Sequence, residues 1–276
     1  TVGDLYHHQP IIINSLYYTL QDSETTWETN VLGTLNLLES LKTMNKKCSV
    51  VIITTDKVYK NLNMHFGFRE NDELGGHDPY SASKAACEIA VSSWRDSFCG
   101  KNHNLNKYLK IATARSGNVI GGGDWAEDRI VPDTIMAFKS KIPVSLRNPN
   151  YTRPWQHVLD PLSGYLALAK TNYISDKPLC EAFNFGPRIE SNRTVSELVR
   201  EVMKHWPGKI SNIVEKNPLH ESELLHLQID KSYKLLNWKP KWGFEKSVEK
   251  TVNWYKKFYD RSSSFDCMMN DIDNYF

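Results

Sequence analysis

The sequence predicts an α/β fold built around a parallel sheet. Ser49–Ile53 is a continuous run rich in β-branched residues, as expected of a strand buried on both faces, and residues 108–115 form a second strand. Between them, Asp78-Pro79 opens a helix over residues 79–98, because proline fits the first turn of a helix. Strands that alternate with helices indicate parallel pairing through right-handed crossovers.

The segments before residue 118 keep this alternation. Residues 26–44 carry Val31, Leu35 and Leu38 at helical spacing, which predicts a helix ahead of the first strand. Residues 60–78 are polar and rich in glycine, which predicts a loop. The order of these elements is that of a doubly wound parallel sheet.

After about residue 118 the alternation loosens, so we expect a smaller lobe to begin there. Gly121-Gly122-Gly123 breaks the chain, and Thr194 with Glu197 has the spacing of a capping box for a helix to about residue 205. The other elements expected in this lobe are helices at residues 130–140 and 161–171, a short strand and turn at 183–186, and a last amphipathic helix at 244–259.

Composition narrows the class of protein. The 276 residues include 34 Lys and Arg against 32 Asp and Glu, so the net charge of +2 gives no electrostatic reason to expect nucleic acid or membrane binding. No apolar run reaches the roughly 18 residues of a membrane-spanning helix. The five cysteines are widely spaced without a Cys-x-x-Cys motif, which favours reduced thiols in a cytoplasmic protein over disulfides or a metal site.

Two short motifs carry groups that can move protons. Tyr80 and Lys84 are four residues apart and share one helical face. A cation beside a phenol favours the phenolate, so the tyrosine can act as a base well below its ordinary pKa of about 10. Thr55-Asp56-Lys57 follows the apolar strand directly and supplies a hydroxyl, a carboxyl acid and an amine base. Active sites of open parallel sheets lie at the carboxyl ends of strands.

With these motifs, the run from Arg115 to Arg129, which contains Gly-Gly-Gly-Asp-Trp, resembles the extended short-chain dehydrogenase/reductases, also called the NAD-dependent epimerase/dehydratase family. Within that family the chain is most similar to the CDP-glucose 4,6-dehydratases. A lysine as the third residue of the triplet separates it from the dTDP-glucose dehydratases, which carry glutamate there. The likeness covers about residues 24–258, with further matches at residues 30–34, 153–158 and 238–240.

The resemblance implies roles for eight residues. Tyr80 would be the base for oxidation, and Lys84 would assist it, both residues also contacting NAD. The triplet would complete the catalytic set. The residues implied for binding the nucleotide sugar are Asn118, Arg129 and Arg153, since a guanidinium suits a diphosphate.

The implied reaction is the dehydration of a nucleotide sugar, CDP-glucose giving CDP-4-keto-6-deoxyglucose. Tyr80 would take the proton of the 4-hydroxyl while hydride passes from C4 to NAD, with Thr55 polarising the 4-oxygen. Lys57 would remove the acidified proton on C5, and Asp56 would protonate the departing 6-hydroxyl. Hydride would then return to C6.

The family's architecture implies a partial Rossmann-like, NAD-binding domain over residues 1–117. A mainly substrate-binding lobe would cover residues 118–276, with some segments returning to the sheet. It also implies a homodimer or larger homo-oligomer through paired helices that include residues 79–98.

One departure from the family lies at the start of the chain. The family begins with a strand, a Gly-x-x-Gly-x-x-Gly turn and a helix that binds the NAD pyrophosphate, and this sequence has no such turn. We therefore expect two βαβ-type units, about 60–80 residues, to be missing from the front, with weakened NAD binding. His7-His8 stand before Gln9-Pro10, where the family has small residues.

Three alternatives remain open at this point. The chain could be another nucleotide-sugar 4,6-dehydratase, or an epimerase, which needs only the ketone step. It could also be a catalytically inactive fragment that lacks the phosphate-binding loop and binds nucleotide sugars or a partner subunit.

Overall fold

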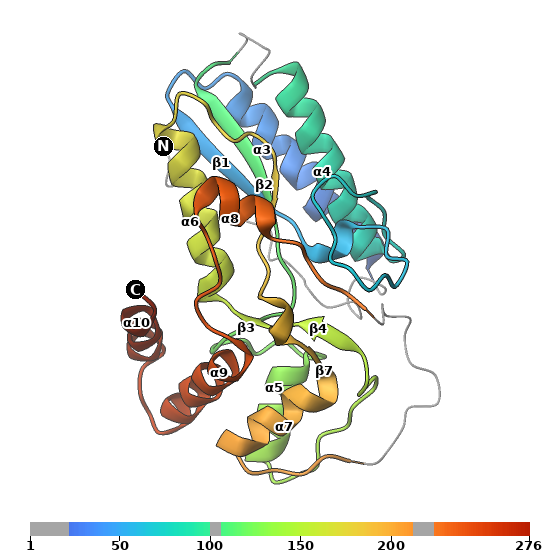
Figure 1. The fold of residues 1–276 in the computed structure, drawn as a ribbon, viewed down its shortest axis with the longest axis vertical. Helices are drawn as coiled ribbons and strands as arrows, with labels where there is room; N and C mark the ends of the chain where they lie inside the picture. Colours follow the sequence, from blue (N-terminus) through green and yellow to red (C-terminus); the bar gives the residue numbers. More distant parts are fainter. Residues whose placement is uncertain (1–21, 100–105, 212–223) are drawn as a thin grey trace. The chain divides into compact units, whose positions relative to one another are not determined.

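The computed structural model describes residues 22–99, 106–211 and 224–276 (Figure 1). The expectations for the first 21 residues lie outside this described part of the chain. The helices and helical turns are α2 (Ser23–Trp27), η2 (Glu28–Leu32), α3 (Gly33–Lys42), η3 (Asp56–Val58), α4 (Pro79–Ser97), α5 (Ile130–Lys139), α6 (Leu159–Ile174), η4 (Ile189–Ser191), α7 (Val195–His205), α8 (Asp230–Leu236), α9 (Phe244–Tyr259) and α10 (Ser264–Tyr275). The strands are β1 (Cys48–Ile53), β2 (Leu109–Arg115), β3 (Val119–Ile120), β4 (Thr152–Pro154), β5 (Gln156–His157), β6 (Ala182–Asn184) and β7 (Asn192–Thr194).

The chain divides into two compact units, each made of segments distant in sequence. The first unit contains residues 1–60, 73–114 and 169–182. The second contains residues 61–72, 115–168 and 183–276. The boundary therefore passes through β2, α6 and β6, so no single cut in the sequence separates the units.

A parallel sheet organises the first unit, which confirms the predicted fold class. β1 and β2 pair in parallel with Cys48 opposite Leu109 and Ile53 opposite Ala114. The strand order is β1-β2-β6, so within the described residues β1 pairs with β2 alone. The side chains of β1 are accordingly only partly buried along most of the strand, whereas those of the central β2 are nearly all buried.

Helices α3 and α4 pack against each other beside this sheet (Figure 1). Their inward side chains, Leu38 and Val91, are fully buried and share a core with Leu109 and Ile111 of β2. Burying side chains of this size contributes about 1.5–3 kcal/mol each. The core fixes α4 against the strands, and α4 begins where predicted because Pro79 follows an Asp78 cap that accepts from the backbone of Ser81.

The second unit buries its apolar residues among α5, α7 and α9. Ile135, Leu198 and Val252 come from these three helices and are fully buried. The predicted capping box is confirmed: Thr194 Oγ1 accepts from the backbone of Glu197, and the Glu197 carboxylate accepts from the backbone of Thr194.

Gly122 has a packing role in this unit. A Cβ added to Gly122 would lie 2.0 Å from the Trp254 ring of α9, so only glycine allows the backbone to lie against that ring. Next to it, Gly123 adopts φ +79°, which favours glycine. The glycine run therefore allows the loop after β3 to pack closely against α9.

Two expectations about this unit are wrong or incomplete. The helix at 244–259 has the predicted bounds, but it is not the last, because α10 follows it. Sequence patterns also missed α8 and the two-stranded pairs β3–β5 and β4–β7. These strands are two or three residues long, too short to show periodicity.

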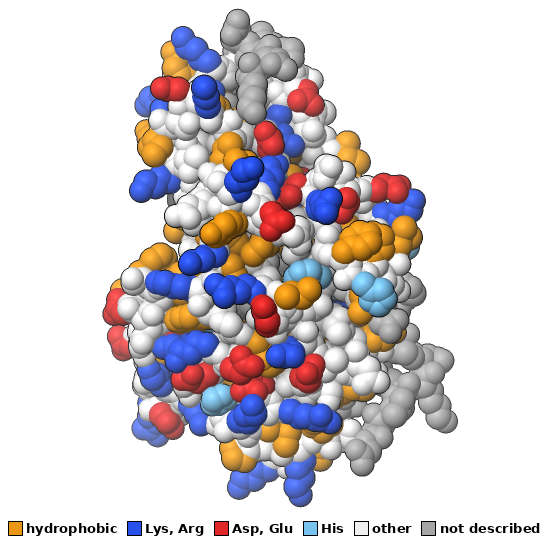
Figure 2. Space-filling view, viewed as in Figure 1, with side chains coloured by type: hydrophobic (Ala, Val, Ile, Leu, Met, Phe, Trp, Pro, Cys, Tyr) orange, Lys and Arg blue, Asp and Glu red, His pale blue; other side chains and the backbone are white. Residues whose placement is uncertain are grey.

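Charges of both signs are interspersed on the face in view in Figure 2. That pattern gives this face no extended field of one sign, in keeping with the near balance of charges in the sequence. Across the described residues, every helix is too short or too polar to cross a membrane.

His157 of β5 is a buried neutral imidazole. It is 1% exposed, its Nδ1 accepts from the backbone of Leu159, and its ring centroid lies 4.7 Å from that of Trp242. Burial, assisted by the Lys250 cation, lowers the pKa of His157 from 6.5 to about 4. The folded state therefore resists a proton that the unfolded chain binds readily.

This shift predicts a loss of stability in mild acid. The contribution of a neutral His157 is complete above pH 6.5, falls as the pH drops toward 4 and is constant below that. The free energy of unfolding can be measured with denaturant at several pH values. Between pH 6.5 and pH 4 it should fall by about 3 kcal/mol less in His157→Gln than in wild type. Thr134→Val changes a fully buried residue without a titratable group, so this control should keep the wild-type slope. Equal slopes for His157→Gln and wild type would contradict the assignment.

Candidate active site

The triplet predicted from sequence lies at the carboxyl end of β1. The backbone N–H of Thr54 donates to Ala114 O at 2.9 Å, which extends the pairing with β2 by one residue. Thr55 then caps the short helical turn η3, with its Oγ1 accepting from the backbone of Lys57 at 3.4 Å. The cap turns the chain sharply, so Asp56 and Lys57 leave the strand in a defined direction.

Asp56 is fully buried and only partly satisfied. Its Oδ1 accepts from Thr55 Oγ1 at 3.1 Å, and Lys57 Nζ lies 3.9 Å from the same oxygen. Its Oδ2 is buried without a hydrogen-bond partner in the described part of the chain. A buried, unpartnered carboxyl oxygen is costly. The Lys57 side chain is 43% exposed, so the amine stays accessible beside the carboxyl group.

Tyr80 and Lys84 both lie on α4, one turn apart, as the spacing predicts. Tyr80 is half-buried near the start of the helix. Lys84 is 7% exposed, and burial lowers its pKa, an effect partly opposed by Cys87. A buried ammonium gains from a neighbouring anion, so a phenolate at Tyr80 and a charged Lys84 would stabilise each other.

Helix α4 packs directly against η3, so the structure brings the Tyr80–Lys84 helix and the triplet together. It also packs against the π-helical turn η2, where Asn30 is 8% exposed. Asn30 Nδ2 donates to Ser83 Oγ at 3.0 Å, and Cys87 Sγ donates to Asn30 O at 2.6 Å. Isolated π-turns of this kind are frequent at functional sites.

Ser83 was not among the residues predicted for the site. It is fully buried, and its Oγ donates to Tyr80 O at 2.9 Å while it accepts from Asn30. The sequence does show Ser83 between Tyr80 and Lys84, but the Tyr–Lys spacing assigns no role to the helix face on which Ser83 lies. Its link to Asn30 spans 53 residues, which no local pattern reveals.

The residues predicted for substrate binding belong to the second unit. Asn118 adopts φ 48°, in the left-handed region, and its Oδ1 is buried without a partner among the described residues. Arg129 immediately precedes α5, and its Nη1 donates to Asp124 Oδ2 at 2.9 Å. Arg129 thus already has an anionic partner within the second unit.

Arg153 of β4 is 7% exposed, and its Nη1 donates to Thr152 O at 2.8 Å. Its Cζ lies 5.7 Å from the Tyr151 ring centroid. The antiparallel pairing of β4 with β7 sets Arg153 opposite Arg193. Arg193 has an anionic partner of its own, since its Nη1 lies 3.9 Å from Glu197 Oε1.

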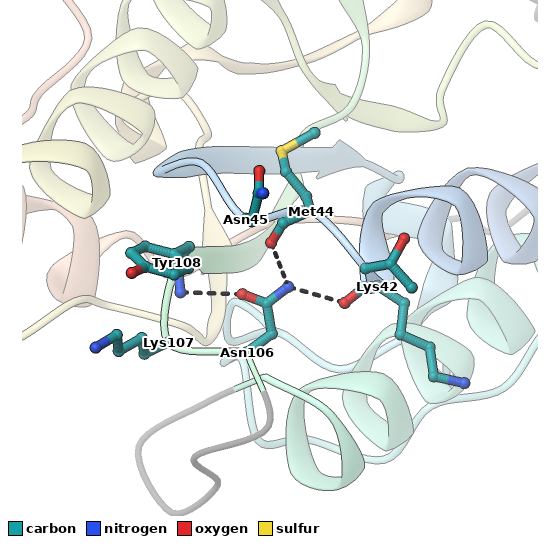
Figure 3. Close-up of a pocket in the computed structure, with 7 residues that line it drawn as sticks. Lys42, Met44, Asn45, Asn106, Lys107 and Tyr108 are labelled. Carbon is teal, nitrogen blue, oxygen red and sulfur yellow. Dashed lines mark hydrogen bonds between the residues drawn. The ribbon is translucent and has the colours of Figure 1, made fainter.

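The cavity drawn in Figure 3 lies at the other end of the sheet. It measures about 450 Å³ and is lined by the segments that precede β1 and β2. Asn106 spans it: Nδ2 donates to Lys42 O and Met44 O, and Oδ1 accepts from the backbone of Tyr108 (Figure 3). With the amide occupied by backbone groups, Asn106 acts there as a structural link, and the cavity is separate from the triplet.

Comparison with known proteins agrees with this arrangement. The family described as GDP-mannose 4,6 dehydratase matches residues 15–251. The chain is 39% identical over 251 residues to CDP-glucose 4,6-dehydratase of Salmonella typhimurium, an alignment that covers 91% of this chain and 70% of that protein. It is 27% identical to dTDP-glucose 4,6-dehydratase of Haemophilus influenzae, covering 86% of this chain and 71% of the relative.

Solved structures show the same fold. The crystal structure of dTDP-glucose 4,6-dehydratase from Bacillus anthracis in complex with NAD has a TM-score of 0.68 at 24% identity, covering 84% of this chain and 68% of that chain. UDP-glucose 4-epimerase of Thermotoga maritima gives a TM-score of 0.74 at 19% identity, covering 94% and 80%. The predicted resemblance to epimerases and dehydratases is confirmed, and the chain belongs to the GDP-mannose 4,6-dehydratase family.

Proposed function

We propose that this chain is a hydro-lyase that dehydrates a nucleotide sugar with NAD, converting CDP-glucose to CDP-4-keto-6-deoxyglucose. The observation that carries the proposal is the packing of α4, with Tyr80 and Lys84, against η3, with Asp56 and Lys57. Two proton-handling centres are thereby set beside each other at the carboxyl end of a parallel strand. The identity to the CDP-glucose enzyme of Salmonella typhimurium supports the choice of substrate.

The residues on α4 suit the nicotinamide end of NAD. Lys84 is a buried cation that gains from hydrogen-bond acceptors such as ribose hydroxyls, and Tyr80 lies one turn from it. When bound there, NAD would supply the hydride chemistry of the reaction, as acceptor toward C4 of the sugar and donor toward C6. Tyr80 and Lys84 would hold the nicotinamide ribose in this arrangement.

Oxidation at C4 requires a base for the 4-hydroxyl proton. Tyr80 takes that proton as the phenolate, which the neighbouring Lys84 ammonium stabilises. Thr55, whose hydroxyl lies next to Asp56, polarises the 4-oxygen. Charge that develops on that oxygen is then shared between the two hydroxyl groups.

Elimination of water requires a second base and an acid. The 4-ketone acidifies the hydrogen on C5. A neutral Lys57 would remove this proton with its exposed amine and return it to C5 when hydride adds to C6. Asp56 in its protonated form donates to the departing 6-hydroxyl through the buried oxygen that lacks a partner. An epimerase has no use for this pair, so the pair favours dehydration.

The second unit supplies the groups proposed for the nucleotide sugar. Arg153 binds the diphosphate as a buried guanidinium, with Asn118 and Arg129 as further contacts. In domain terms, we propose that the cofactor-binding part comes mainly from residues 1–117 and the substrate lobe mainly from residues 118–276, with some later segments, such as β6, returning to the sheet.

We also propose a cytoplasmic homodimer that pairs α4 with its copy. Apolar side chains on this helix and its neighbours are exposed, including Ile89 at 61% and Leu32 at 53%. A second copy of the same surface would bury both.

The direct test of function is product analysis. The purified chain is incubated with NAD and CDP-glucose, and in parallel with the UDP, dTDP and GDP sugars. A 4-keto-6-deoxy product develops ultraviolet absorbance in alkali, whereas an epimerase product does not. Turnover of CDP-glucose to the keto product is the expected result. Formation of a C4 epimer alone, or turnover confined to another nucleotide, would contradict the proposal.

Tyr80→Phe should abolish turnover while leaving the affinity for the nucleotide sugar within about twofold of wild type. Removing one hydroxyl deletes the base and little contact area. Steady-state rates and calorimetric titration with CDP-glucose measure the two quantities. Tyr173→Phe on α6 is the matched control, since Tyr173 is 50% exposed on the same unit. Wild-type turnover by Tyr80→Phe would remove Tyr80 from the mechanism.

Lys57→Ala should stop the reaction after oxidation, so that reduced cofactor accumulates on the enzyme when substrate is added. The reason is that Tyr80 performs oxidation and Lys57 the later proton abstraction. Stopped-flow absorbance of the reduced nicotinamide records it. Lys60→Ala removes a lysine three positions along, which pairs at the surface with Glu73 at 2.9 Å, and should behave as wild type. A Lys57→Ala enzyme that forms no reduced cofactor would place Lys57 in an earlier step.

A further inference from the structure

Glu88 lies two turns beyond Tyr80 on α4, on the stripe that also contains Lys84. It is 2% exposed, and both oxygens of its carboxyl group are used. Thr54 Oγ1 donates to Oε1 at 2.5 Å, and Thr113 Oγ1 donates to Oε2 at 2.7 Å. One side chain of the helix is thus bonded to two neighbouring strands.

Such an arrangement is costly unless it is satisfied in full. A buried carboxylate has lost its hydration, and hydrogen bonds from donors held in place must compensate. Thr54 and Thr113 are themselves 6% and 0% exposed, so their hydroxyls are fixed by the surrounding core. The bond from Thr54 spans 34 residues and the bond from Thr113 spans 25. Two fixed donors define where the helix lies along and across the strands.

The position of Thr54 connects this hydrogen bond to the candidate active site. Thr54 immediately precedes Thr55, Asp56 and Lys57, and its backbone already bonds to Ala114 O. Its hydroxyl therefore ties the first residue after β1 to the helix that carries Tyr80. Without it, this direct tie between α4 and the strand exit is lost, and apolar packing between them tolerates small shifts.

We infer that Glu88 is a positioning residue, which sets the distance between the oxidation pair Tyr80–Lys84 and the triplet Thr55–Lys57 by binding Thr54 and Thr113 at once. The inference rests on the proposed function for its effect on rate. Its geometric content, that Glu88 holds the segment after β1, is independent of that function. Misplacing reacting groups by about 1 Å can cost about a hundredfold in rate.

The test compares three substitutions in the full chain. Thr54→Val keeps the shape of the side chain and removes the hydroxyl. Glu88→Gln keeps the length, and its amide can accept from one threonine and donate to the other, since a hydroxyl does both. Thr251→Val is the matched control: Thr251 is 1% exposed, and its Oγ1 donates within α9 to Ser247 O at 2.8 Å.

If Glu88 has a positioning role, loss of the link should lower kcat and leave KM nearly unchanged. Thr54→Val should lower kcat for CDP-glucose at least about tenfold relative to Thr251→Val, with KM within about twofold. Glu88→Gln should retain kcat within about threefold of wild type, because the two links survive. Equal kcat values for Thr54→Val and Thr251→Val would overturn the inference. So would a Glu88→Gln enzyme as slow as Thr54→Val, because charge rather than position would then matter.

Hydrogen exchange separates this inference from the proposed function. In Thr54→Val, amide exchange in the peptide covering residues 54–60 should speed up, while in Thr251→Val it should stay at the wild-type rate. If the wild-type chain has no dehydratase activity but the two variants show this exchange pattern, the proposed function is wrong and the geometric role of Glu88 is still supported. Unchanged exchange at residues 54–60 in Thr54→Val would defeat the inference itself.

Discussion

The parallel register of β1 and β2 is the constraint on which the first unit depends. With Ile53 opposite Ala114, both strands leave the sheet at the same edge, and Thr54 continues the pairing for one residue more. Parallel strands place all their carboxyl ends together, so the triplet can only emerge at that edge. The amino ends meet at the opposite edge, where Asn106 joins the two incoming segments. The triplet and the Asn106 link thus lie at opposite ends of the sheet.

Two kinds of contact stabilise this structure: buried polar hydrogen bonds and close aromatic packing. Around α4, buried polar groups satisfy one another over long sequence separations, as in Asn30 with Ser83. Such contacts are directional, so they restrict the helix to one position. The second unit combines such contacts, as in Tyr275 with Asp160, with close aromatic packing of Trp125 against Tyr255 and Phe258 of α9. A site that needs precise distances between acids and bases is better served by the first kind of contact.

Local signals were sufficient to predict the main elements of the structure. The Asp78-Pro79 start of α4, the Thr194–Glu197 box and the β-branched run of β1 each depend on neighbours within four residues, and each appears where expected. Sequence spacing also placed Tyr80 and Lys84 on one helix. It could not show that Glu88 reaches Thr54, because that contact exists only once β1 and α4 have packed. Whether a polar residue on a helix faces solvent or a strand is likewise decided by tertiary structure.

Trp254 limits how the loop after β3 can evolve. Residue 122 lies against the face of that indole, so a side chain of any size there requires the ring to leave. Trp254 in turn stacks on Phe258 with the ring planes 11° apart, so its departure would also unseat a neighbour in α9. A larger residue at this point of the loop would therefore have to arise together with a change in the helix. A single substitution at Gly122 would not be accommodated, so a designer altering the loop should randomise positions 122 and 254 in one library.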